Sequence, residues 1–458
     1  MMLLSQAAQA LGGRLVGRNV EFSAVSSDSR KVAPGDLFVA LRGENFDGAL
    51  FVAQAVTDGA VAALVNEASY HGGEAPCPLL LVDDTRLALG RLAAHWRAQF
   101  DLPVVGLTGS NGKTTVKEML AAILREATGS ADSVLATEGN LNNDIGLPLT
   151  LLGLRASHRY AVIEMGMNHP GEIDYLTRIA APDVAIVNNA AAAHLAGLGS
   201  VEAVAHAKGE IFAGLSEGGV AVINADDEFE PLWREMAQPH YVLDFALDAP
   251  AAVRACWDVT ESGIQMEITT PEGVAGVNLQ VPGAHNARNA LAAVAAALAL
   301  RVPLQTIAQG LEKFGGVKGR LQRKPARRGA LLIDDTYNAN PASMRAALQV
   351  LAQAPGKRIF VMGDMGELGA GEEQLHAEVG RTAQRLGIQR LLAVGKLSRA
   401  AVQEFGPGAQ HFDDVESLCM ELDKELAAGT TVLVKGSRFM RMERVVQRAQ
   451  QEETCCSH

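Results

Sequence analysis

Residues 106–115 read Gly106-Leu107-Thr108-Gly109-Ser110-Asn111-Gly112-Lys113-Thr114-Thr115. An apolar run of strand length, Val104–Thr108, leads into this stretch, and apolar residues at helical spacing follow it. A strand, a glycine-rich turn and a helix N-terminus together place several backbone N–H groups around a phosphate. The strict phosphate-loop pattern has a glycine where Leu107 stands, so the sequence predicts a variant form of the loop.

Each polar side chain of this loop has an expected partner on a nucleotide. The ammonium of Lys113 is placed for the β- and γ-phosphates, and the hydroxyl of Thr114 is placed for Mg²⁺. The candidate nucleotide-binding residues of the loop are Thr108, Gly109, Ser110, Asn111, Gly112, Lys113, Thr114 and Thr115.

Strand-length apolar runs alternate with helical patterns over most of the chain. The runs lie at residues 104–108, 160–165, 184–188, 220–224, 331–334, 359–362, 391–394 and 432–434. This alternation is typical of doubly wound, mainly parallel sheets. We therefore expect an α/β protein with three domains. These are a smaller N-terminal domain over 1–102, a central phosphate-loop domain over 103–320 and a Rossmann-like C-terminal domain over 321–458.

The bulk composition excludes several classes of protein. A net charge of −12 over 458 residues argues against a sequence-independent nucleic-acid binder. The five cysteines are few and scattered, which favours a reducing compartment over a disulfide framework. Residues 1–18 do not resemble a signal peptide, and the longest apolar run, 290–300, is too short to span a bilayer. We expect a cytoplasmic protein without a membrane span.

Further polar residues are ambiguous when each is taken alone. Glu164 ends a predicted strand, where a carboxylate suits Mg²⁺ beside nucleotide phosphates. His194 follows a strand end and Lys208 falls in a helical pattern, and each alone is typical of an ordinary structural residue. Cys455, Cys456 and His458 could clip a metal, although a frayed terminus is the favoured interpretation.

Taken in order, these motifs resemble those of the Mur ligase family over nearly the whole chain. The matching segments are the loop, Asn140-Leu141-Asn142-Asn143, Glu164-Met165-Gly166, His194 with Lys208, His285-Asn286-Ala287-Arg288-Asn289, Gly319-Arg320 and Asp335-Thr336-Tyr337-Asn338-Ala339-Asn340-Pro341. The resemblance implies an ATP-dependent ligase that joins a carboxylate to an amine through an acyl phosphate and releases ADP.

The resemblance also implies roles for individual residues. Thr114 and Glu164 would hold one Mg²⁺, and His194 with a carbamylated Lys208 would hold a second. The expected catalytic residues are Lys113, Glu164, His194 and Lys208. Asn286 and Asn289 would lie at the adenine, while Arg320 and Asp335 would reach the nucleotide from the C-terminal domain, with Asp335 at the ribose.

Within the family, two segments are most similar to the member that adds D-alanyl-D-alanine to UDP-N-acetylmuramoyl-tripeptide in cytoplasmic peptidoglycan precursor synthesis. They are residues 335–345 and Gly363-Asp364-Met365-Gly366-Glu367-Leu368-Gly369. The resemblance implies that the C-terminal domain holds most of the amine substrate, and we expect Asn338 and Asn340 to contact it. It implies a uridine-nucleotide site at Ser27, Asp28, Ser29, Arg30, Phe46 and Asp47. We expect a monomer.

Other functions stay open at this point. A sister Mur enzyme or a folate polyglutamate ligase would share the central motifs, although the folate enzyme lacks a separate uridine-nucleotide domain. The string Asp-Asn-Pro-Arg, expected in the enzyme that adds a diamino acid, is absent. A guanine-nucleotide switch would usually carry an Asn-Lys pair, and none occurs in the sequence.

Overall fold

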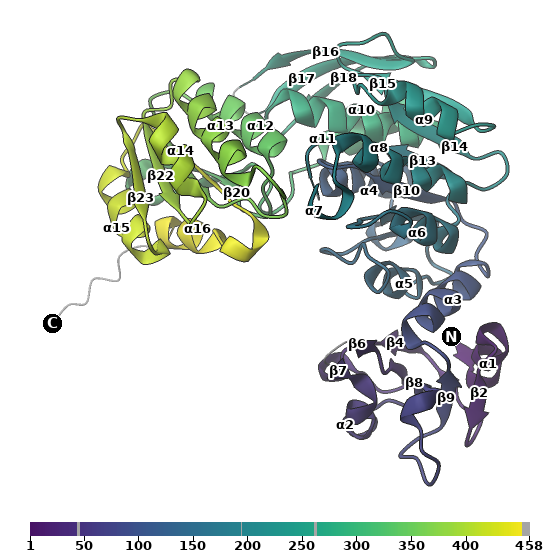
Figure 1. Cartoon of the computed structure of the whole chain (residues 1–458). Coiled ribbons are helices and arrows are strands. Elements are labelled where there is room, and N and C mark those ends of the chain that lie inside the picture. The colour runs from purple at the N-terminus through teal and green to yellow at the C-terminus, as the bar shows by residue number, and fades with distance from the viewer. Residues whose placement is uncertain (44–45, 194, 261–262, 451–458) are drawn as a thin grey trace.

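The computed structural model describes residues 1–43, 46–193, 195–260 and 263–450. Its three larger sheets follow one another along the chain, and each forms the centre of a separate unit (Figure 1). The N-terminal and C-terminal units lie apart from each other, and the central unit joins them (Figure 1). The predicted α/β class with mostly parallel sheets is confirmed.

The N-terminal unit contains a five-stranded sheet in which only the edge strand β2 runs antiparallel. In sheet order, its strands are β2 (Arg14–Val16), β9 (Leu79–Val82), β8 (Ala62–Asn66), β5 (Asp36–Val39) and β4 (Ala24–Ser26). The short pairs are β1 (Met2–Leu3) with β3 (Glu21–Phe22) and β6 (Arg42–Gly43) with β7 (Phe46–Asp47). The helices are α1 (Leu4–Leu11), α2 (Val52–Thr57) and α3 (Thr85–Arg97). Helix α3 packs on α5 (Gly146–Leu151) and α6 (Glu172–Ala180) of the central unit.

The central sheet has nine strands, and its order places the phosphate loop at a crevice. The strands are β11 (Val134–Ala136), β12 (Tyr160–Glu164), β10 (Val104–Thr108), β13 (Val184–Val187), β14 (Val220–Asn224), β15 (Tyr241–Ala246), β16 (Val253–Val259), β17 (Ile264–Thr270) and β18 (Gly273–Leu279). The chain leaves β10 toward β11 and β12 on one side and returns to β13 on the other. In such sheets, ligands bind at the carboxyl ends of the strands where the winding reverses.

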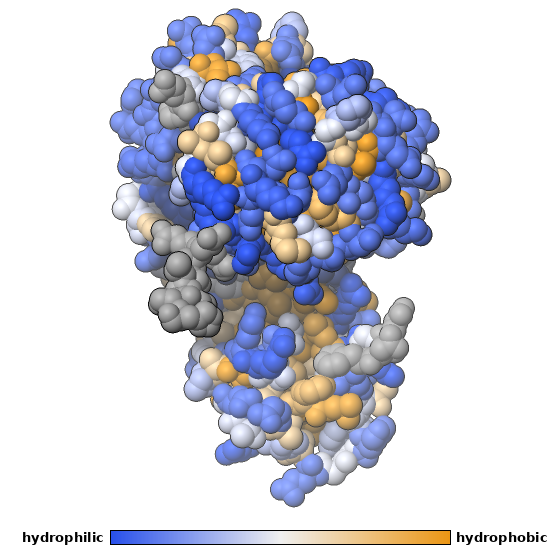
Figure 2. Space-filling model, turned by 90° about the vertical axis from the view of Figure 1, so that its left-hand side faces the viewer, coloured by the Kyte–Doolittle hydropathy of each residue, from blue (hydrophilic) through white to orange (hydrophobic). Residues whose placement is uncertain are grey.

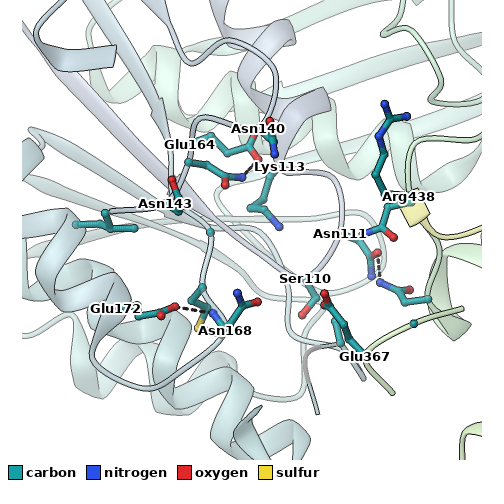
Figure 3. Close-up of a pocket in the computed structure, with 18 of the residues that line it drawn as sticks. Ser110, Asn111, Lys113, Asn140, Asn143, Glu164, Asn168, Glu172, Glu367 and Arg438 are labelled. Carbon is teal, nitrogen blue, oxygen red and sulfur yellow. Dashed lines mark hydrogen bonds between the residues drawn. The ribbon is translucent and has the colours of Figure 1, made fainter. Parts of the chain in front are cut away.

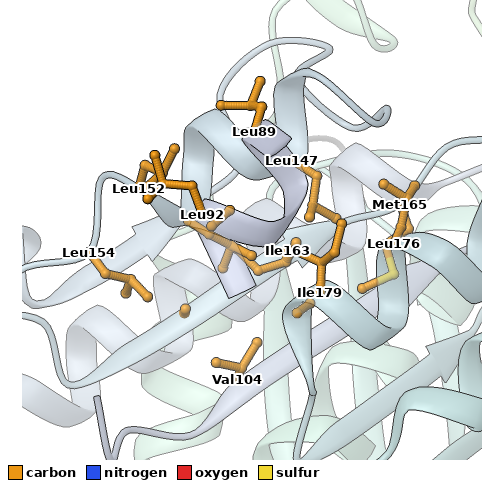
Figure 4. Close-up of a cluster of buried hydrophobic side chains, with 14 of the residues drawn as sticks. Leu89, Leu92, Val104, Leu147, Leu152, Leu154, Ile163, Met165, Leu176 and Ile179 are labelled. Carbon is orange, nitrogen blue, oxygen red and sulfur yellow. The ribbon is translucent and has the colours of Figure 1, made fainter. Parts of the chain in front are cut away.

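Helices cover both faces of this sheet. On one face lie α4 (Lys113–Thr128), α10 (Ala284–Ala299) and α11 (Leu304–Glu312). On the other face lie α5 (Gly146–Leu151), α6 (Glu172–Ala180), α7 (Leu195–Leu198), α8 (Val201–Gly209) and α9 (Glu230–Met236). Figure 4 shows how leucines of α3 reach the same apolar cluster as Leu147, Ile163 and Leu176. The N-terminal unit is therefore anchored to the central unit by a shared core.

The sequence did not predict the antiparallel strands β16, β17 and β18. Those strands alternate buried and exposed residues, as in Ile264–Thr270, because one face of this part of the sheet meets water. The parallel strands that the sequence predicted, such as β10 and β13, are continuous buried apolar runs, which is the pattern of strands covered on both faces. The parallel strands β11, β15 and β23 lack such a run, and the sequence did not predict them.

The C-terminal unit is a six-stranded, Rossmann-like sheet with one antiparallel edge strand. Its strands are β19 (Gln322–Pro325), β20 (Leu331–Asp335), β24 (Thr430–Lys435), β21 (Lys357–Gly363), β22 (Arg390–Val394) and β23 (Ala409–Phe412). Its helices are α12 (Pro341–Ala352), α13 (Glu372–Arg385), α14 (Ser398–Phe405), α15 (Val415–Glu425) and α16 (Glu443–Gln450). The N-terminal cap of α12, Asn340, faces the phosphate loop, because its side-chain amide donates to the side chain of Asn111.

Figure 2 views the molecule from the side of the C-terminal unit and shows a hollow between this unit and the N-terminal unit below it. Hydrophilic residues cover most of the upper body, while apolar residues gather around the hollow. Among the described residues, no helix combines the length and the apolar character needed to cross a bilayer.

The contact between α11 and α4 gives a test of the packing behind the phosphate loop. A Cβ at Gly310 would lie 2.4 Å from the Cα of Ile123, which belongs to the backbone of α4. Inside a helix, alanine is normally more stable than glycine by about 1 kcal/mol. Here the clash of the new Cβ with the backbone of α4 should outweigh that gain. We expect Gly310→Ala to lower the free energy of unfolding by about 1–3 kcal/mol in denaturant titrations. Gly276→Ala is the control, because a Cβ there meets nothing within 4 Å, and an equal loss in both variants would contradict this packing.

Candidate active site

The phosphate loop is held by asparagine side chains from neighbouring strand ends. Asn189 makes three hydrogen bonds to the loop: its carbonyl accepts from Ser110 N at 3.0 Å, its Oδ1 accepts from Asn111 N at 2.8 Å, and its Nδ2 donates to the Asn111 carbonyl at 3.0 Å. Asn188 Nδ2 donates to the Asn111 carbonyl at 3.0 Å and to Asn289 Oδ1 at 3.0 Å. The loop is therefore already shaped without a ligand, by neutral groups that do not compete electrostatically for a phosphate.

Glycine is required at position 112 of this loop. Gly112 has a φ of +81°, and a Cβ there would lie 2.3 Å from Asn289 Oδ1 and 2.6 Å from Asn188 Nδ2. The close approach lets the first turn of α4 begin directly at Lys113. A helix that begins in an open loop presents unpaired N–H groups and a partial positive charge.

Lys113 lies across the loop, with its Nζ donating to the Gly109 carbonyl at 2.7 Å. Burial lowers the pKa of Lys113, and the nearby guanidinium of Arg320 lowers it further, whereas the carboxylate of Glu164 opposes both effects. Because Lys113 lies near both Glu164 and Arg320, its ammonium can bind anionic groups of a ligand that enters the space between them.

Glu164 is the last residue of β12 and is only 2 % exposed. Its Oε1 accepts from Asn142 Nδ2 at 2.8 Å (Figure 3), while its buried Oε2 has no hydrogen-bond partner among the residues that the structure describes. A buried oxygen without a partner costs about 1–3 kcal/mol, and more when it is charged. This arrangement fits a hard cation, because Mg²⁺ binds carboxylate oxygens beside phosphates.

Lys208 lies near the C-terminus of α8 and is 1 % exposed. Its Nζ makes no hydrogen bond or ion pair with the part of the chain that the structure describes. Burial lowers the pKa of Lys208 well below its ordinary value, and the charge of Lys113 lowers it further. The predicted partner of Lys208, His194, lies outside the described residues.

A cavity of about 420 Å³ lies between the loop, the start of α10 and the C-terminal unit. Asn286 and Asn289 line it from the first two turns of α10, and Asn286 Nδ2 donates to the Pro282 carbonyl at 2.7 Å. His285 lies beside them, and burial lowers its pKa to about 4. An uncharged imidazole and two amides form a surface with the donors and acceptors that a purine base can pair with.

Three further charged side chains line this cavity: Arg320 from the linker before β19, and Asp335 and Lys435 from the C-terminal unit. The guanidinium of Arg320 lies 4.1 Å above the ring of Tyr337. Asp335 accepts from Lys435 Nζ at 2.5 Å and from Leu321 N at 3.2 Å. The sequence did not indicate Lys435, because a lysine at the end of an apolar strand looks like a solvated terminus.

Asn338 and Asn340 lie in a second, larger cavity of about 970 Å³. Asn340 Nδ2 donates to Asn111 Oδ1 at 2.8 Å, while its Oδ1 caps α12 by accepting from Ser343 N. Asn338 accepts from Lys435 through its carbonyl and from Ala339 N through its side chain. Both side-chain groups of Asn340 are therefore engaged, and one of them docks the C-terminal unit on the phosphate loop.

The larger cavity is formed by all three units, and Figure 3 shows residues of the central and C-terminal units that line it. Ser110, Lys113 and Glu164 line it from the central unit, and Glu367 and Arg438 line it from the C-terminal unit. From the N-terminal side, α3 contributes Arg86, which pairs with Asp144 through a hydrogen bond of 2.8 Å from Nη2 to Oδ1. The sequence gave no signal for Arg86, because its partner lies 58 residues away.

The predicted uridine-nucleotide residues lie away from this cavity. Asp28 and Arg30 form an exposed ion pair of 2.9 Å, and Ser27 and Ser29 flank Asp28. Asp47 accepts from Ala49 N and from Ser69 Oγ, both at 2.9 Å. The side chain of Phe46 lies outside the described part of the structure, as do Cys455, Cys456 and His458.

Comparison with known proteins assigns the class. Three family models match the chain: "Mur ligase family, catalytic domain" over 21–97, "Mur ligase middle domain" over 107–297 and "Mur ligase, glutamate ligase domain" over 319–438. Together they cover most of the chain, which therefore belongs to the Mur ligase family. It is an ATP-dependent ligase that forms carbon–nitrogen bonds and has the three-domain fold of that family.

Individual relatives match the chain almost from end to end. UDP-N-acetylmuramoyl-tripeptide–D-alanyl-D-alanine ligase of Escherichia coli (strain K12) is 46 % identical over 456 residues, which is 99 % of each chain. The crystal structure of MurF from Acinetobacter baumannii superimposes with a TM-score of 0.90 at 41 % identity, over 97 % of each chain. MurF ligase from Thermotoga maritima in complex with ADP has a TM-score of 0.81 at 28 % identity, over 93 % of this chain and 96 % of its own.

The unpaired oxygen of Glu164 gives a direct test of the cation site. Glu164→Gln keeps the shape and the bond to Asn142 but removes the charge, so we expect turnover at a fixed Mg²⁺ concentration to fall by at least about 100-fold. The Mg²⁺ concentration needed for half-maximal activity should rise, while the melting temperature should not fall. Glu210→Gln is the control, because both oxygens of Glu210 already accept from backbone N–H groups. An unchanged Mg²⁺ dependence in Glu164→Gln would contradict the site.

Proposed function

We propose that this chain joins UDP-N-acetylmuramoyl-tripeptide to D-alanyl-D-alanine at the expense of ATP, in cytoplasmic peptidoglycan precursor synthesis. The observation that carries this proposal is the 46 % identity, over 99 % of both chains, to a ligase named for this reaction. The segment 335–345 supports the same substrate pair. A folate polyglutamate ligase and a sister Mur enzyme are disfavoured, because relatives with this one name match over more than nine-tenths of the chain.

The nucleotide would lie between the central and C-terminal domains. The triphosphate would bind the backbone of residues 109–115, where Lys113 and the N-terminus of α4 offset its charge. The adenine would enter the cavity of about 420 Å³ beside Asn286 and Asn289. Arg320 would reach the phosphates, and Asp335 would accept from a ribose hydroxyl through a lone pair that its two present bonds leave free.

The proposal includes divalent cations at two places. Thr114 and Glu164 would hold one Mg²⁺, which the unpaired Oε2 of Glu164 supports. His194 and a carbamylated Lys208 would hold the second. When bound, the two ions supply positive charge at the oxygens that attack and leave phosphorus.

Carbamylation would complete the contacts of Lys208. Its Nζ, without a partner among the described residues, would first lose one proton to solvent and then, as an uncharged amine, attack the carbon of CO₂. A new N–C bond then forms as one C=O π bond opens onto oxygen, and the nitrogen loses a second proton to solvent. The product is an anionic carbamate, which would turn a cation next to Lys113 into a metal ligand.

The remaining chemistry follows from charge and exclusion of water. The terminal carboxylate of the UDP-linked peptide attacks the γ-phosphorus, ADP leaves, and an acyl phosphate forms. The dipeptide amine attacks the acyl carbon, phosphate leaves, and the amine proton is released. Lys113 and Arg320 would hold the transferred phosphoryl group, and closure of the three-domain cavity would keep water from the acyl phosphate.

Substrate residues and domain limits complete the proposal. Asn338 and Asn340 would contact the amine substrate, and Ser27, Asp28, Ser29, Arg30, Phe46 and Asp47 would hold the uridine nucleotide. The domains would span 1–102, 103–320 and 321–458, and the chain would act as a monomer. Because Asn340 already binds Asn111, its contact with the dipeptide would use the outer face of the amide.

Product analysis tests the reaction. With UDP-N-acetylmuramoyl-tripeptide, D-alanyl-D-alanine, ATP and Mg²⁺, we expect one ADP and one UDP-linked pentapeptide per turnover by coupled chromatography and mass spectrometry. Omission of the peptide or the dipeptide should stop sustained ADP release. Sustained release without the dipeptide would instead indicate a nucleotide hydrolase, and incorporation of glutamate in place of the dipeptide would indicate another ligase.

The carbamate has its own spectroscopic test. After incubation with ¹³C-bicarbonate, the full chain should show a carbamate carbon resonance that Lys208→Ala lacks. The matched control is Lys117→Ala, because Lys117 is equally buried but is already bonded to the Thr137 carbonyl and paired with Glu118. A carbamate signal that survives in Lys208→Ala, or no signal in the unaltered chain, would refute the modification.

A further inference from the structure

The linker between the central and C-terminal sheets has an unusual backbone on both sides of Arg320. Gly319 has a φ of +70°, which glycine tolerates, but Leu321 has a φ of +47°. A bulky residue in the left-handed region costs about 1–3 kcal/mol and persists only where its surroundings impose it. The structure must therefore contain groups that hold Leu321 in place.

Hydrogen bonds to the end of β20 hold this linker. Leu321 N donates to Asp335 Oδ1 at 3.2 Å, and the Gly319 carbonyl accepts from Tyr337 N at 3.2 Å. Within the linker, Arg320 N donates to the Val317 carbonyl at 3.1 Å. The backbone on each side of Arg320 is thus fixed to residues 335–337.

Asp335 is itself fixed by Lys435, which is paired with it across neighbouring parallel strands. Lys435 Nζ donates to Asp335 Oδ2 at 2.5 Å and to the Asn338 carbonyl at 2.9 Å. Lys435 is 1 % exposed and Asp335 is 6 % exposed. Because breaking a buried ion pair costs about 3–5 kcal/mol, Asp335 has one stable position while Lys435 is present.

This arrangement fixes the position of Arg320. Its guanidinium lies against the Tyr337 ring, and Arg320 lines both the 970 Å³ cavity and the 420 Å³ cavity. It is also close enough to Lys113 for its charge to lower the pKa of that lysine. A triphosphate at the loop would therefore lie between two cations, Lys113 of the loop and Arg320 of the linker.

We propose that Lys435 is a positioning residue for nucleotide binding. Lys435 holds Asp335, Asp335 holds Leu321 in its left-handed conformation, and Leu321 thereby fixes Arg320 toward the triphosphate. We call Lys435, Asp335 and Leu321 the brace. The inference rests on the proposed placement of ATP at residues 109–115, and it gives Asp335 a structural task in addition to a contact with the ribose.

A double-mutant cycle on the full chain tests the brace. ATP affinity is measured by calorimetry for the unaltered chain, Lys435→Met, Arg320→Ala and the combination. We expect Lys435→Met alone to weaken ATP binding by about tenfold, but by less than about twofold in the Arg320→Ala background, because coupled residues are not additive. A full tenfold loss in that background would mean that Lys435 acts independently of Arg320, and this would overturn the proposal.

A ribose analogue separates the brace from a ribose contact. The brace predicts the same loss in Lys435→Met with 2′,3′-dideoxy-ATP as with ATP. If the loss disappears with the dideoxy nucleotide, Lys435 acts through the ribose hydroxyls and the brace is refuted.

Lys324→Met is the matched control. Lys324 pairs with buried Asp334 at 2.6 Å, one residue before Asp335, yet neither residue lines the two cavities. Its ATP affinity should stay within about twofold of the unaltered chain even if its melting temperature falls. A tenfold loss in this control would show that any broken ion pair on β20 has the effect, and the proposal would fail.

A second variant covers the case in which Lys435→Met does not fold, and a binding assay separates the brace from the proposed reaction. If Lys435→Met does not fold, Lys435→Met with Asp335→Asn removes both buried charges, and the same loss and the same non-additivity with Arg320→Ala are expected. ATP binding is measured without peptide or dipeptide, so absence of ligation by the unaltered chain would contradict the proposed reaction while the cycle still judges the brace.

Discussion

The active site must overcome the electrostatic repulsion between two anionic reactants, the carboxylate of the peptide substrate and the triphosphate of ATP. At about 4 Å and an effective dielectric constant of about 20, two unit charges of like sign repel by about 4 kcal/mol. A triphosphate carries several negative charges, so its repulsion of a carboxylate is larger. The chain as a whole is also acidic, with a net charge of −12. Reaction therefore requires cations concentrated at one place, which explains why Lys113, Arg320 and the N-terminus of α4 lie around the same cavities.

The side chains that hold the phosphate loop in place are neutral amides, and this has a physical benefit. Amide side chains of asparagine shape the phosphate loop, attach it to α10 and dock it on the C-terminal domain through Asn340. Charged side chains in these positions would compete with the nucleotide for Lys113. Among the acidic groups that line the two cavities, Glu164 has a buried oxygen without a partner in the described part of the chain, which leaves this oxygen for a metal.

Local features of this protein could be predicted from the sequence, and long-range features could not. The loop, its flanking strand and the end of β12 at Glu164 depend on neighbouring residues, so apolar runs and glycines indicated them. The pairing of Asp335 with Lys435 spans 100 residues, and that of Asn340 with Asn111 spans 229. No periodic sequence pattern indicates such long-range pairs. The left-handed conformation of Leu321 results from these contacts and not from its own residue type. The roles of His194, Lys208 and the uridine-nucleotide residues remain proposals.

The most direct measurement of the central claim is a crystal structure of the full chain with a non-hydrolysable ATP analogue and Mg²⁺. If charge neutralisation at the loop governs the reaction, the triphosphate will lie on the backbone of residues 109–115, with Lys113 and Arg320 on its oxygens and a cation at Glu164. Density for the triphosphate away from these residues, in crystals whose analogue is fully occupied, would contradict the claim.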